Sequence, residues 1–203
     1  MKNNELDQEY YLMVVDGADN HPLLAWGDFD DTPFLETTPL DVSELELPLK
    51  AEFDEPFPKK YEMADLHMLS CEYACSEGFK KVFDENNIYG VEFFPLETIT
   101  DNKGAVITGY YATHIWNTIR AIDMNNYIGP KPNRKGNIIG IRKFSLDVAI
   151  QEIPLEKRLI FELGDSPVMY IVHQSLQEKL EKAGLKGFRF FRVDDWDEDA
   201  MFR

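Results

Sequence analysis

The sequence predicts an α+β protein with a mixed, largely antiparallel sheet and two main helices, built around a helix-turn-strand unit that the chain uses twice. The first copy lies in residues 76–96 and the second in residues 173–193, and a shift of 97 positions aligns them. In both copies, apolar residues with helical spacing precede a short aromatic strand. Two apolar runs around Gly164-Asp165-Ser166-Pro167 form a hairpin signal, which indicates antiparallel pairing.

Each helix is predicted from an apolar face and from the residue that precedes it. Ser76 has a side chain that suits the N-cap position, whereas its counterpart, His173, is a poor capping residue type. The apolar residues that recur at i and i+4 are Phe79 with Phe83 and Leu176 with Leu180.

The turns between helix and strand follow the same rule in both copies. Asn87 and Gly184 come just after the predicted helices, and these residue types best tolerate a left-handed backbone. In a Schellman ending the next residue packs back onto the helix. Duplication of one unit and chance similarity of two amphipathic segments both account for the match. The expected packing pairs are Ile88 with Phe83 and Leu185 with Leu180.

The chain is predicted to have two parts. Residues 1–60 form an acidic, proline-rich segment packed on the core, and residues 61–203 form an α+β domain with an acidic C-terminal tail. Residues 10–15 are aromatic and β-branched, so a strand is expected there. Residues 21–58 hold six of the 11 prolines but also five aromatic residues, which favours an ordered wrapping segment over disorder.

Two stretches of the second part are predicted as strands from residue type. Residues 105–122 alternate aromatic and β-branched types, which favours a strand, but Ile115, Ile119 and Ile122 also have helical spacing. Residues 138–146 are predicted as a strand as well. The helical alternative for residues 105–122 stays open at this point.

The net charge of −16 is distributed unevenly along the chain. Residues 1–60 carry −11, residues 61–193 carry −1, and the last ten residues carry −4. An acidic surface repels nucleic acid and anionic lipid, so neither is an expected partner, and it attracts a basic protein by long-range steering. Solubility alone also accounts for such acidity.

Length and composition indicate a globular, cytoplasmic protein. A chain of 203 residues with 44% hydrophobic content can bury a sizeable core. No run approaches the roughly 20 apolar residues of a membrane span, and the first residues lack the apolar stretch of a secretory signal. Cys71 and Cys75 are too few for a disulfide framework and fit a reducing compartment.

Two acidic clusters supply the candidate partner-binding residues. The first consists of Asp28, Asp30 and Asp31. The second surrounds Trp196, which is either a hot-spot anchor for a basic partner or the residue that fixes the terminus to the core. The acids of this second cluster are Asp194, Asp195, Asp197, Glu198 and Asp199.

No metal and no cofactor are expected. His67, Cys71 and Cys75 are four positions apart, which would align three ligands on a helix, but the matching segment of the second copy is a strand. Because a zinc site normally has four ligands, buried thiols are favoured. The acidic run at residues 28–31 lacks the glycine turn and the later glutamate of a calcium loop.

Two other classes of function are alternatives. A metal-dependent or hydrolytic enzyme would rest on His114 with Asp123, or on the run at residues 28–31, but no nucleophile motif stands beside them. A structural histidine is favoured. A general protein-binding adaptor would require an exposed apolar groove.

The residues also resemble a known family. The features that carry the resemblance are a strand ending at Ser76, a helix, Gly90-Val91-Glu92-Phe93-Phe94-Pro95, then Tyr110-Tyr111 and Ala121-Ile122-Asp123, and a closing Leu176-x-x-x-Leu180-x-x-Ala183-Gly184-Leu185-x-Gly187-x-x-Phe190. Together they resemble the myxococcal-type immunity protein eleven family over residues 66–193. Residues 1–60 match less well, and His173 stands where the family has a helix-capping serine.

The resemblance implies a cytoplasmic immunity protein of a bacterial polymorphic-toxin system, which binds one toxin domain and blocks its action. Residues 61–203 would then be the immunity-like domain. The matching motifs are packing motifs, so the protein is expected not to be an enzyme. A neutral body with acidic ends suits capture of a basic toxin, for instance a nuclease.

Overall fold

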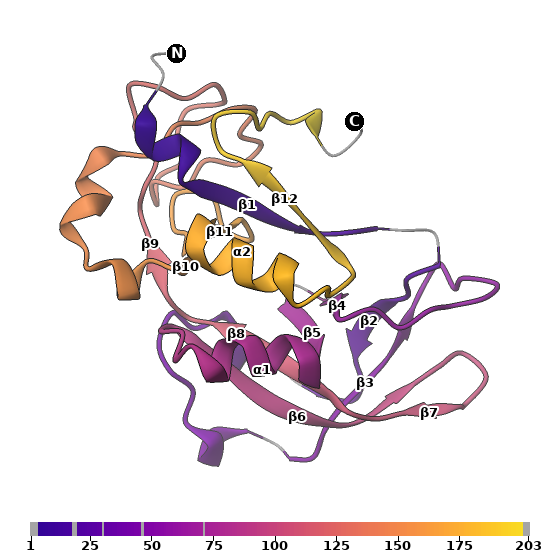
Figure 1. The fold of residues 1–203 in the computed structure, drawn as a ribbon. Coiled ribbons are helices and arrows are strands. Elements are labelled where there is room, and N and C mark those ends of the chain that lie inside the picture. Colours follow the sequence, from indigo (N-terminus) through magenta and orange to yellow (C-terminus); the bar gives the residue numbers. More distant parts are fainter. Residues whose placement is uncertain (1–3, 18–19, 30, 46, 71, 201–203) are drawn as a thin grey trace.

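The computed structural model describes residues 4–17, 20–29, 31–45, 47–70 and 72–200, and its strands form two sheets (Figure 1). Sheet A has the order β12-β1-β11-β10-β9. Its strands are β1 (Tyr10–Val15), β9 (Thr118–Ile119), β10 (Ile160–Leu163), β11 (Tyr170–His173) and β12 (Phe188–Arg192).

Sheet B has the order β3-β2-β4-β5-β8-β6-β7, and β3 also pairs with β6, which closes six of its strands into a ring. Pairing in both sheets is mostly antiparallel, and β9–β10, β2–β4 and β3–β6 are parallel. Its strands are β2 (Leu23–Trp26), β3 (Leu49–Asp54), β4 (Leu66–Leu69), β5 (Glu72–Ser76), β6 (Val91–Thr100), β7 (Val106–Ile107) and β8 (Tyr110–Ile115).

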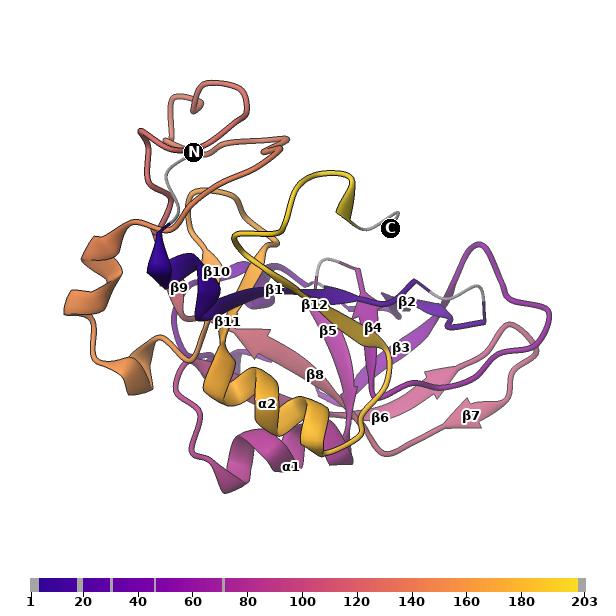
Figure 2. The same cartoon turned by 45° about the horizontal axis from the view of Figure 1, so that its top comes forward.

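Two α-helices are present in the described residues, α1 (Glu77–Glu85) and α2 (Gln174–Lys182), and they lie side by side (Figures 1 and 2). The α+β class with mixed sheets and two helices is therefore confirmed, with the strands divided between two sheets. Five 3-10 helices complete the described structure: η1 (Glu5–Gln8), η2 (Thr32–Leu35), η3 (Val42–Glu44), η4 (Val148–Glu152) and η5 (Leu155–Lys157).

The repeated unit is larger in the structure than in the sequence. In the first unit, β5, α1 and β6 follow one another, and β8 lies between the two strands and is antiparallel to both. In the second unit, β11, α2 and β12 follow one another, and β1 occupies the same intermediate place. Each unit is thus a β-α-β crossover split by an antiparallel strand, which comes from later in the chain in one case and from the N-terminal segment in the other.

The predicted helix ends form in both units. The Ser76 hydroxyl caps α1. Asn87 and Gly184 have φ angles of 48° and 68°, which is the left-handed conformation expected of them. Ile88 donates its N–H to the carbonyl of Phe83 at 3.2 Å, as a Schellman ending requires. In both units the left-handed turn residue therefore ends the helix and reverses the chain into the following strand, β6 or β12.

The prediction that His173 caps its helix poorly is wrong. Its ring Nδ1 accepts the backbone N–H of Ser175 at 3.2 Å. The ring also contacts Tyr10, with centroids 5.1 Å apart. Burial lowers the pKa of His173, and the neutral ring that results has a free lone pair to offer the helix.

Three apolar clusters fill the spaces beside the sheets. The middle cluster draws residues from both sheets and both helices, and in it the counterpart rings of Tyr73 and Tyr170 have centroids 5.0 Å apart. A second cluster, with Phe144 and Phe161, lies against sheet A alone. The third, with Phe34, fills the ring of sheet B. The two units therefore meet at equivalent positions.

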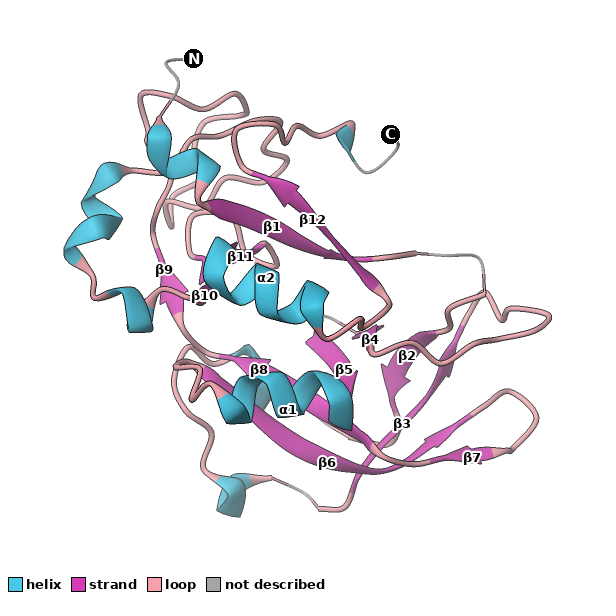
Figure 3. Cartoon of the chain, in the orientation of Figure 1, coloured by secondary structure: helices cyan, strands magenta, loops and turns pink. Residues whose placement is uncertain are grey.

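The structure decides the two uncertain stretches in different ways. Residues 105–122 contain β7, β8 and β9, so the strand prediction is confirmed. Residues 138–146 form no strand, and that prediction is wrong: the stretch makes only isolated bridges, and Gly140 has a φ of 77° (Figure 3). Its apolar residues, such as Ile138 and Phe144, are buried individually in the cluster against sheet A, without strand pairing.

The N-terminal residues supply strands to both sheets. β1 lies at the centre of the second unit, and β2 and β3 belong to the ring of sheet B. Among the described residues, no helix is both long and apolar enough to traverse a lipid bilayer.

Candidate partner-binding site

The first predicted acidic cluster lies on the segment that leads into η2. Asp28 is exposed and Asp31 is half-buried, while Asp30 lies outside the described residues. Asp31 makes no side-chain capping bond to η2. Its charge acts instead on Glu72, whose pKa it helps to raise. The Asp31 carboxylate is therefore close enough to Glu72 to act on it electrostatically.

The second cluster is partly neutralised by one arginine. Arg192 Nε donates to Asp194 Oδ1 at 2.6 Å, and its Nη2 donates to Asp195 Oδ2 at 3.0 Å. Glu198 and Asp199 are exposed and make no side-chain ion pair with a described residue. Asp197 is half-buried. The negative field at this end therefore comes mainly from the last acids of the cluster.

Trp196 differs from the acids around it because it is buried. Its side chain is 6% exposed and its ring centroid is 5.3 Å from that of Phe144, so it fixes the C-terminal segment to the core. Its indole N–H is buried without a hydrogen-bond partner among the described residues. The indole also borders the cavity described next.

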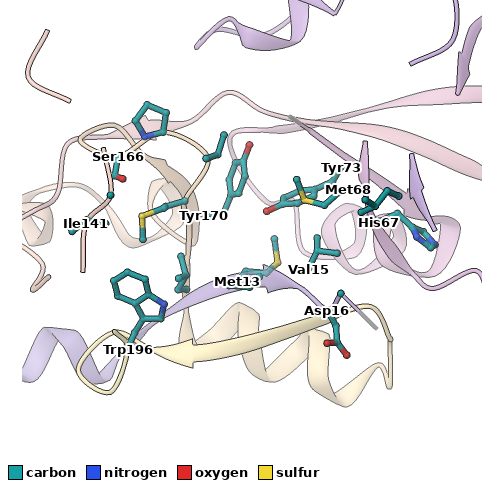
Figure 4. A pocket seen from close by; sticks show the side chains of 18 of the residues that line it. Met13, Val15, Asp16, His67, Met68, Tyr73, Ile141, Ser166, Tyr170 and Trp196 are labelled. Carbon is teal, nitrogen blue, oxygen red and sulfur yellow. The ribbon is translucent and has the colours of Figure 1, made fainter. Parts of the chain in front are cut away.

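An apolar cavity of about 690 Å³ opens between the two sheets. Met13 and Val15 approach it from β1, and Tyr73 and Tyr170 from the two units, with Trp196 at one end (Figure 4). Its rim carries exposed apolar side chains: Ile139 is 75% exposed, Val168 59% and Leu23 41%. We call this feature the apolar cavity.

The polar groups of the apolar cavity are mostly engaged. His67 Nδ1 donates to the carbonyl of Pro22 at 3.0 Å, and Nε2 accepts the N–H of Ala64 at 2.8 Å. Burial lowers the pKa of His67 to about 4, so the ring is neutral and structural. Asp16 pairs with Arg189 at 3.3 Å. The cavity therefore suits apolar or aromatic groups rather than acid/base chemistry.

A second pocket of about 570 Å³ lies next to the apolar cavity and has a different character. Three carboxylates line it, from Glu36, Glu72 and Glu162. Glu72 is 7% exposed, and burial, with the charges of Glu162 and Asp31, raises its pKa to about 8. We call this feature the acidic pocket.

The hairpin between β10 and β11 separates the two pockets. Pro167, Val168 and Tyr170 line both of them. Val168 has a φ of 66°, a conformation that costs a β-branched residue about 1–3 kcal/mol. Glu162 Oε1 accepts the Val168 N–H at 2.8 Å and helps to hold this shape. Strain of this kind, beside two pockets, is typical of binding sites.

The other candidate sites of the sequence are not assembled. His114 Nε2 bonds the carbonyl of Thr38 at 2.9 Å, its Nδ1 has no partner among the described residues, and Asp123 accepts from Asn125. The candidate acid/base pair is therefore not hydrogen-bonded.

Cys75 is buried and its pKa is raised to about 12 by that burial, while Cys71 lies outside the described residues. Within the described ranges, no three His, Cys, Asp or Glu side chains are placed to hold a metal ion.

Glu72 and Glu162 were missed by the sequence analysis. Each is a single acid within an apolar strand, Glu72 beside Tyr73-Ala74-Cys75 and Glu162 within Leu159-Ile160-Phe161-Glu162-Leu163. A lone carboxylate in a buried strand is uncommon unless it is paired. That departure from the strand pattern is the signal by which they could have been found.

The chain is an α+β protein in which an apolar cavity and an acidic pocket lie next to each other. Residues 6–195 match an immunity protein family, Imm11, and the chain belongs to this family. The resemblance found in the sequence is thereby confirmed. Membership implies a toxin as the binding partner. No curated protein sequence matches the chain.

Proposed function

We propose that this protein neutralises a cognate toxin domain in the bacterial cytoplasm by binding it through the concave surface around the β10–β11 hairpin. The observation that carries the proposal is the pairing of the apolar cavity with the acidic pocket on either side of that hairpin. Such a surface offers an apolar anchor site beside a charged one, which is the arrangement of protein–protein hot spots. The protein acts by occupation rather than by catalysis.

The acidic clusters would add long-range electrostatic attraction to this surface. Asp28, Asp30 and Asp31 belong to the segment ahead of the acidic pocket, and the acids around Trp196 belong to the segment at the apolar cavity. Their combined field accelerates encounter with a basic toxin and disfavours nucleic acid and anionic lipid as partners. The acids of the second segment are Asp194, Asp195, Asp197, Glu198 and Asp199.

The test uses the toxin domain encoded beside the gene for this protein. We expect tight binding that weakens as salt is raised, and a slower association rate when Glu198 and Asp199 are replaced by Gln and Asn. Glu178→Gln with Glu181→Gln on α2 is the control, since it removes the same charge away from both pockets. Binding that ignores both salt and the acidic variants would contradict acidic capture.

A general adaptor is the second candidate, because the apolar cavity is the kind of exposed groove that it requires. The two functions differ in selectivity. An immunity protein retains its neighbouring toxin and releases unrelated basic proteins of equal charge, whereas an adaptor binds several partners through the same cavity. Competition between the toxin and such proteins distinguishes them.

A further inference from the structure

The buried carboxylate of Glu72 is the least explained group of the acidic pocket. Glu72 begins β5, two positions before Ala74, whose side chain belongs to the interior of the sheet B ring, so strand alternation turns Glu72 to the same side. Its side chain lines the acidic pocket and is 7% exposed. It makes no hydrogen bond or ion pair with any described residue. A buried carboxyl, whether charged or neutral, normally has a hydrogen-bond or ion-pair partner.

The charges that face Glu72 are mainly of its own sign. Glu162 on β10 and Asp31 before η2 both act on it, and Glu36 lines the same pocket. One arginine, Arg120, also lines the pocket, but its guanidinium lies 3.7 Å from Asp165 and donates to the carbonyls of Lys135 and Gly136. Glu72 therefore makes no ion pair with Arg120 or with any other described residue.

Glu162 is held in a way that Glu72 is not. Its Oε1 accepts the Val168 N–H at 2.8 Å and its Oε2 accepts the Thr118 hydroxyl at 3.4 Å. These bonds tie Glu162 to the walls of the pocket. Glu72 is the buried carboxylate of the pocket and has no hydrogen bond to a described residue, in a space of about 570 Å³ whose apolar and aromatic walls include Phe34, Ile115 and Tyr170.

We propose that the acidic pocket receives an arginine side chain of the toxin, whose guanidinium pairs with Glu72. This inference rests on the proposed function and specifies its chemistry. A guanidinium presents a planar fork of donors to a carboxylate, stacks on aromatic rings, and is less strongly hydrated than an ammonium group. A pocket lined both by carboxylates and by apolar and aromatic side chains suits those properties. The apolar cavity next to it would take the neighbouring apolar residue of the toxin.

The pairing has a proton linkage. Burial and like charges raise the pKa of Glu72 to about 8, so the carboxyl is mostly protonated at pH 7 in the free protein. Pairing with arginine, which stays charged at every accessible pH, favours the carboxylate and expels that proton. Affinity therefore rises as pH rises towards 8.

The first experiment isolates the pocket with a small probe, N-acetyl-L-arginine amide. Carbon-13 NMR follows the Glu72 carboxyl across pH 5 to 10, with and without the probe, and N-acetyl-citrulline amide serves as its uncharged analogue. We expect the arginine probe to lower the titration midpoint of Glu72 by at least one pH unit and the citrulline probe to leave it unchanged. Equal effects of both probes, or no effect of either, would overturn the proposal.

The second experiment uses the toxin domain with wild type, Glu72→Gln and the exposed control Glu178→Gln. We expect Glu72→Gln to weaken binding at least tenfold and to remove the rise in affinity between pH 6 and 8, while Glu178→Gln binds as wild type does. Equal binding by Glu72→Gln overturns the pocket proposal and leaves the immunity function standing. Absence of toxin binding to wild type refutes the proposed function, and the arginine probe then still decides on the pocket.

Discussion

The two split β-α-β units share a frame but differ in the hairpin that enters each helix. In the first unit, β4 and β5 are joined by residues 70 and 71. In the second, β10 and β11 are joined by residues 164–169, part of which lines both pockets. The caps, turns and intermediate strands are otherwise equivalent. Under the proposed function, the toxin-binding surface therefore lies where the second unit departs from the first.

The comparison of the two units also shows that Glu72 differs in chemical type from its counterpart. The shift of 97 positions that aligns Tyr73 with Tyr170 aligns Glu72 with Met169. Met169 packs against the cluster of sheet A, as a scaffold residue at this position would. Glu72 holds a carboxyl in the corresponding place at the cost of burying it. The frame therefore does not require an acid there, and the proposed pairing with an arginine gives a reason for it.

The largest expected effect concerns the glycines that end the turns. A Cβ at Gly187 would lie 2.5 Å from the carbonyl oxygen of Leu66, and one at its counterpart Gly90 would lie 2.2 Å from the Asn117 Cβ, whereas Gly184 has open space. All three have positive φ. Gly187→Ala and Gly90→Ala should each cost about 3 kcal/mol or more, and Gly184→Ala about 1 kcal/mol. Urea unfolding measures this. Equal costs at the three sites would show that the units do not interlock through these turns.

The helix caps should respond differently to acid. Ser76→Ala should cost about 1 kcal/mol throughout pH 7 to 5, because the hydroxyl cap does not titrate and its acceptor Asp65 is ionised in this range. His173 has a lowered pKa, so below about pH 6.5 the unfolded chain takes up a proton that the folded ring resists, and stability falls as pH drops. Compared with His173→Asn, which caps without titrating, wild type should lose stability between pH 7 and 5. A constant difference over this range would refute the ring cap.

The smallest effect concerns the two hairpins. Val168 and Ser70 have φ angles of 66° and 51°, and asparagine tolerates this region better than either residue. Val168→Asn should therefore stabilise the protein by about 1 kcal/mol, and Ser70→Asn by a few tenths of that. Thermal unfolding at matched pH checks the order. A destabilised Val168→Asn variant would mean that the hairpin is held by packing of the valine rather than strained.

Local sequence patterns predicted the helices, turns and some strands, but not how the strands pair. The helices, the left-handed turn residues and the strand at β1 follow from spacing and residue type within a few positions. The intermediate strands do not, because Met13 pairs with Tyr170 across most of the chain and nothing local records that pairing. Residues 138–146 misled for the same reason: apolar residues buried singly resemble a strand when their burial partners are unknown.

The sequence predicted candidate binding residues mainly from charge, and it did not point to Glu72 and Glu162. Composition located the acidic segments, and family resemblance supplied the class of partner. Trp196 remained ambiguous until its burial was known. Glu72 and Glu162 carry too little charge to alter any composition window, and their closeness arises only when β5 and β10 are brought together.

The most direct test of the central claim is the stability of Glu72→Gln and of wild type from pH 5 to 9. The unfolded carboxyl ionises near its ordinary pKa of 4.5, and the folded one near 8, so between these values only the folded state keeps the proton. Wild type should therefore lose about 1.4 kcal/mol per pH unit relative to the glutamine variant over this window, levelling off above pH 8. Glu72→Met carries the residue that stands at the equivalent position of the second unit. The stability of wild type relative to this variant should fall with rising pH in the same way. A glutamine variant that is less stable than wild type at pH 8, or a difference that does not change with pH, would contradict the account, because Glu72 would then already have its partner within the fold.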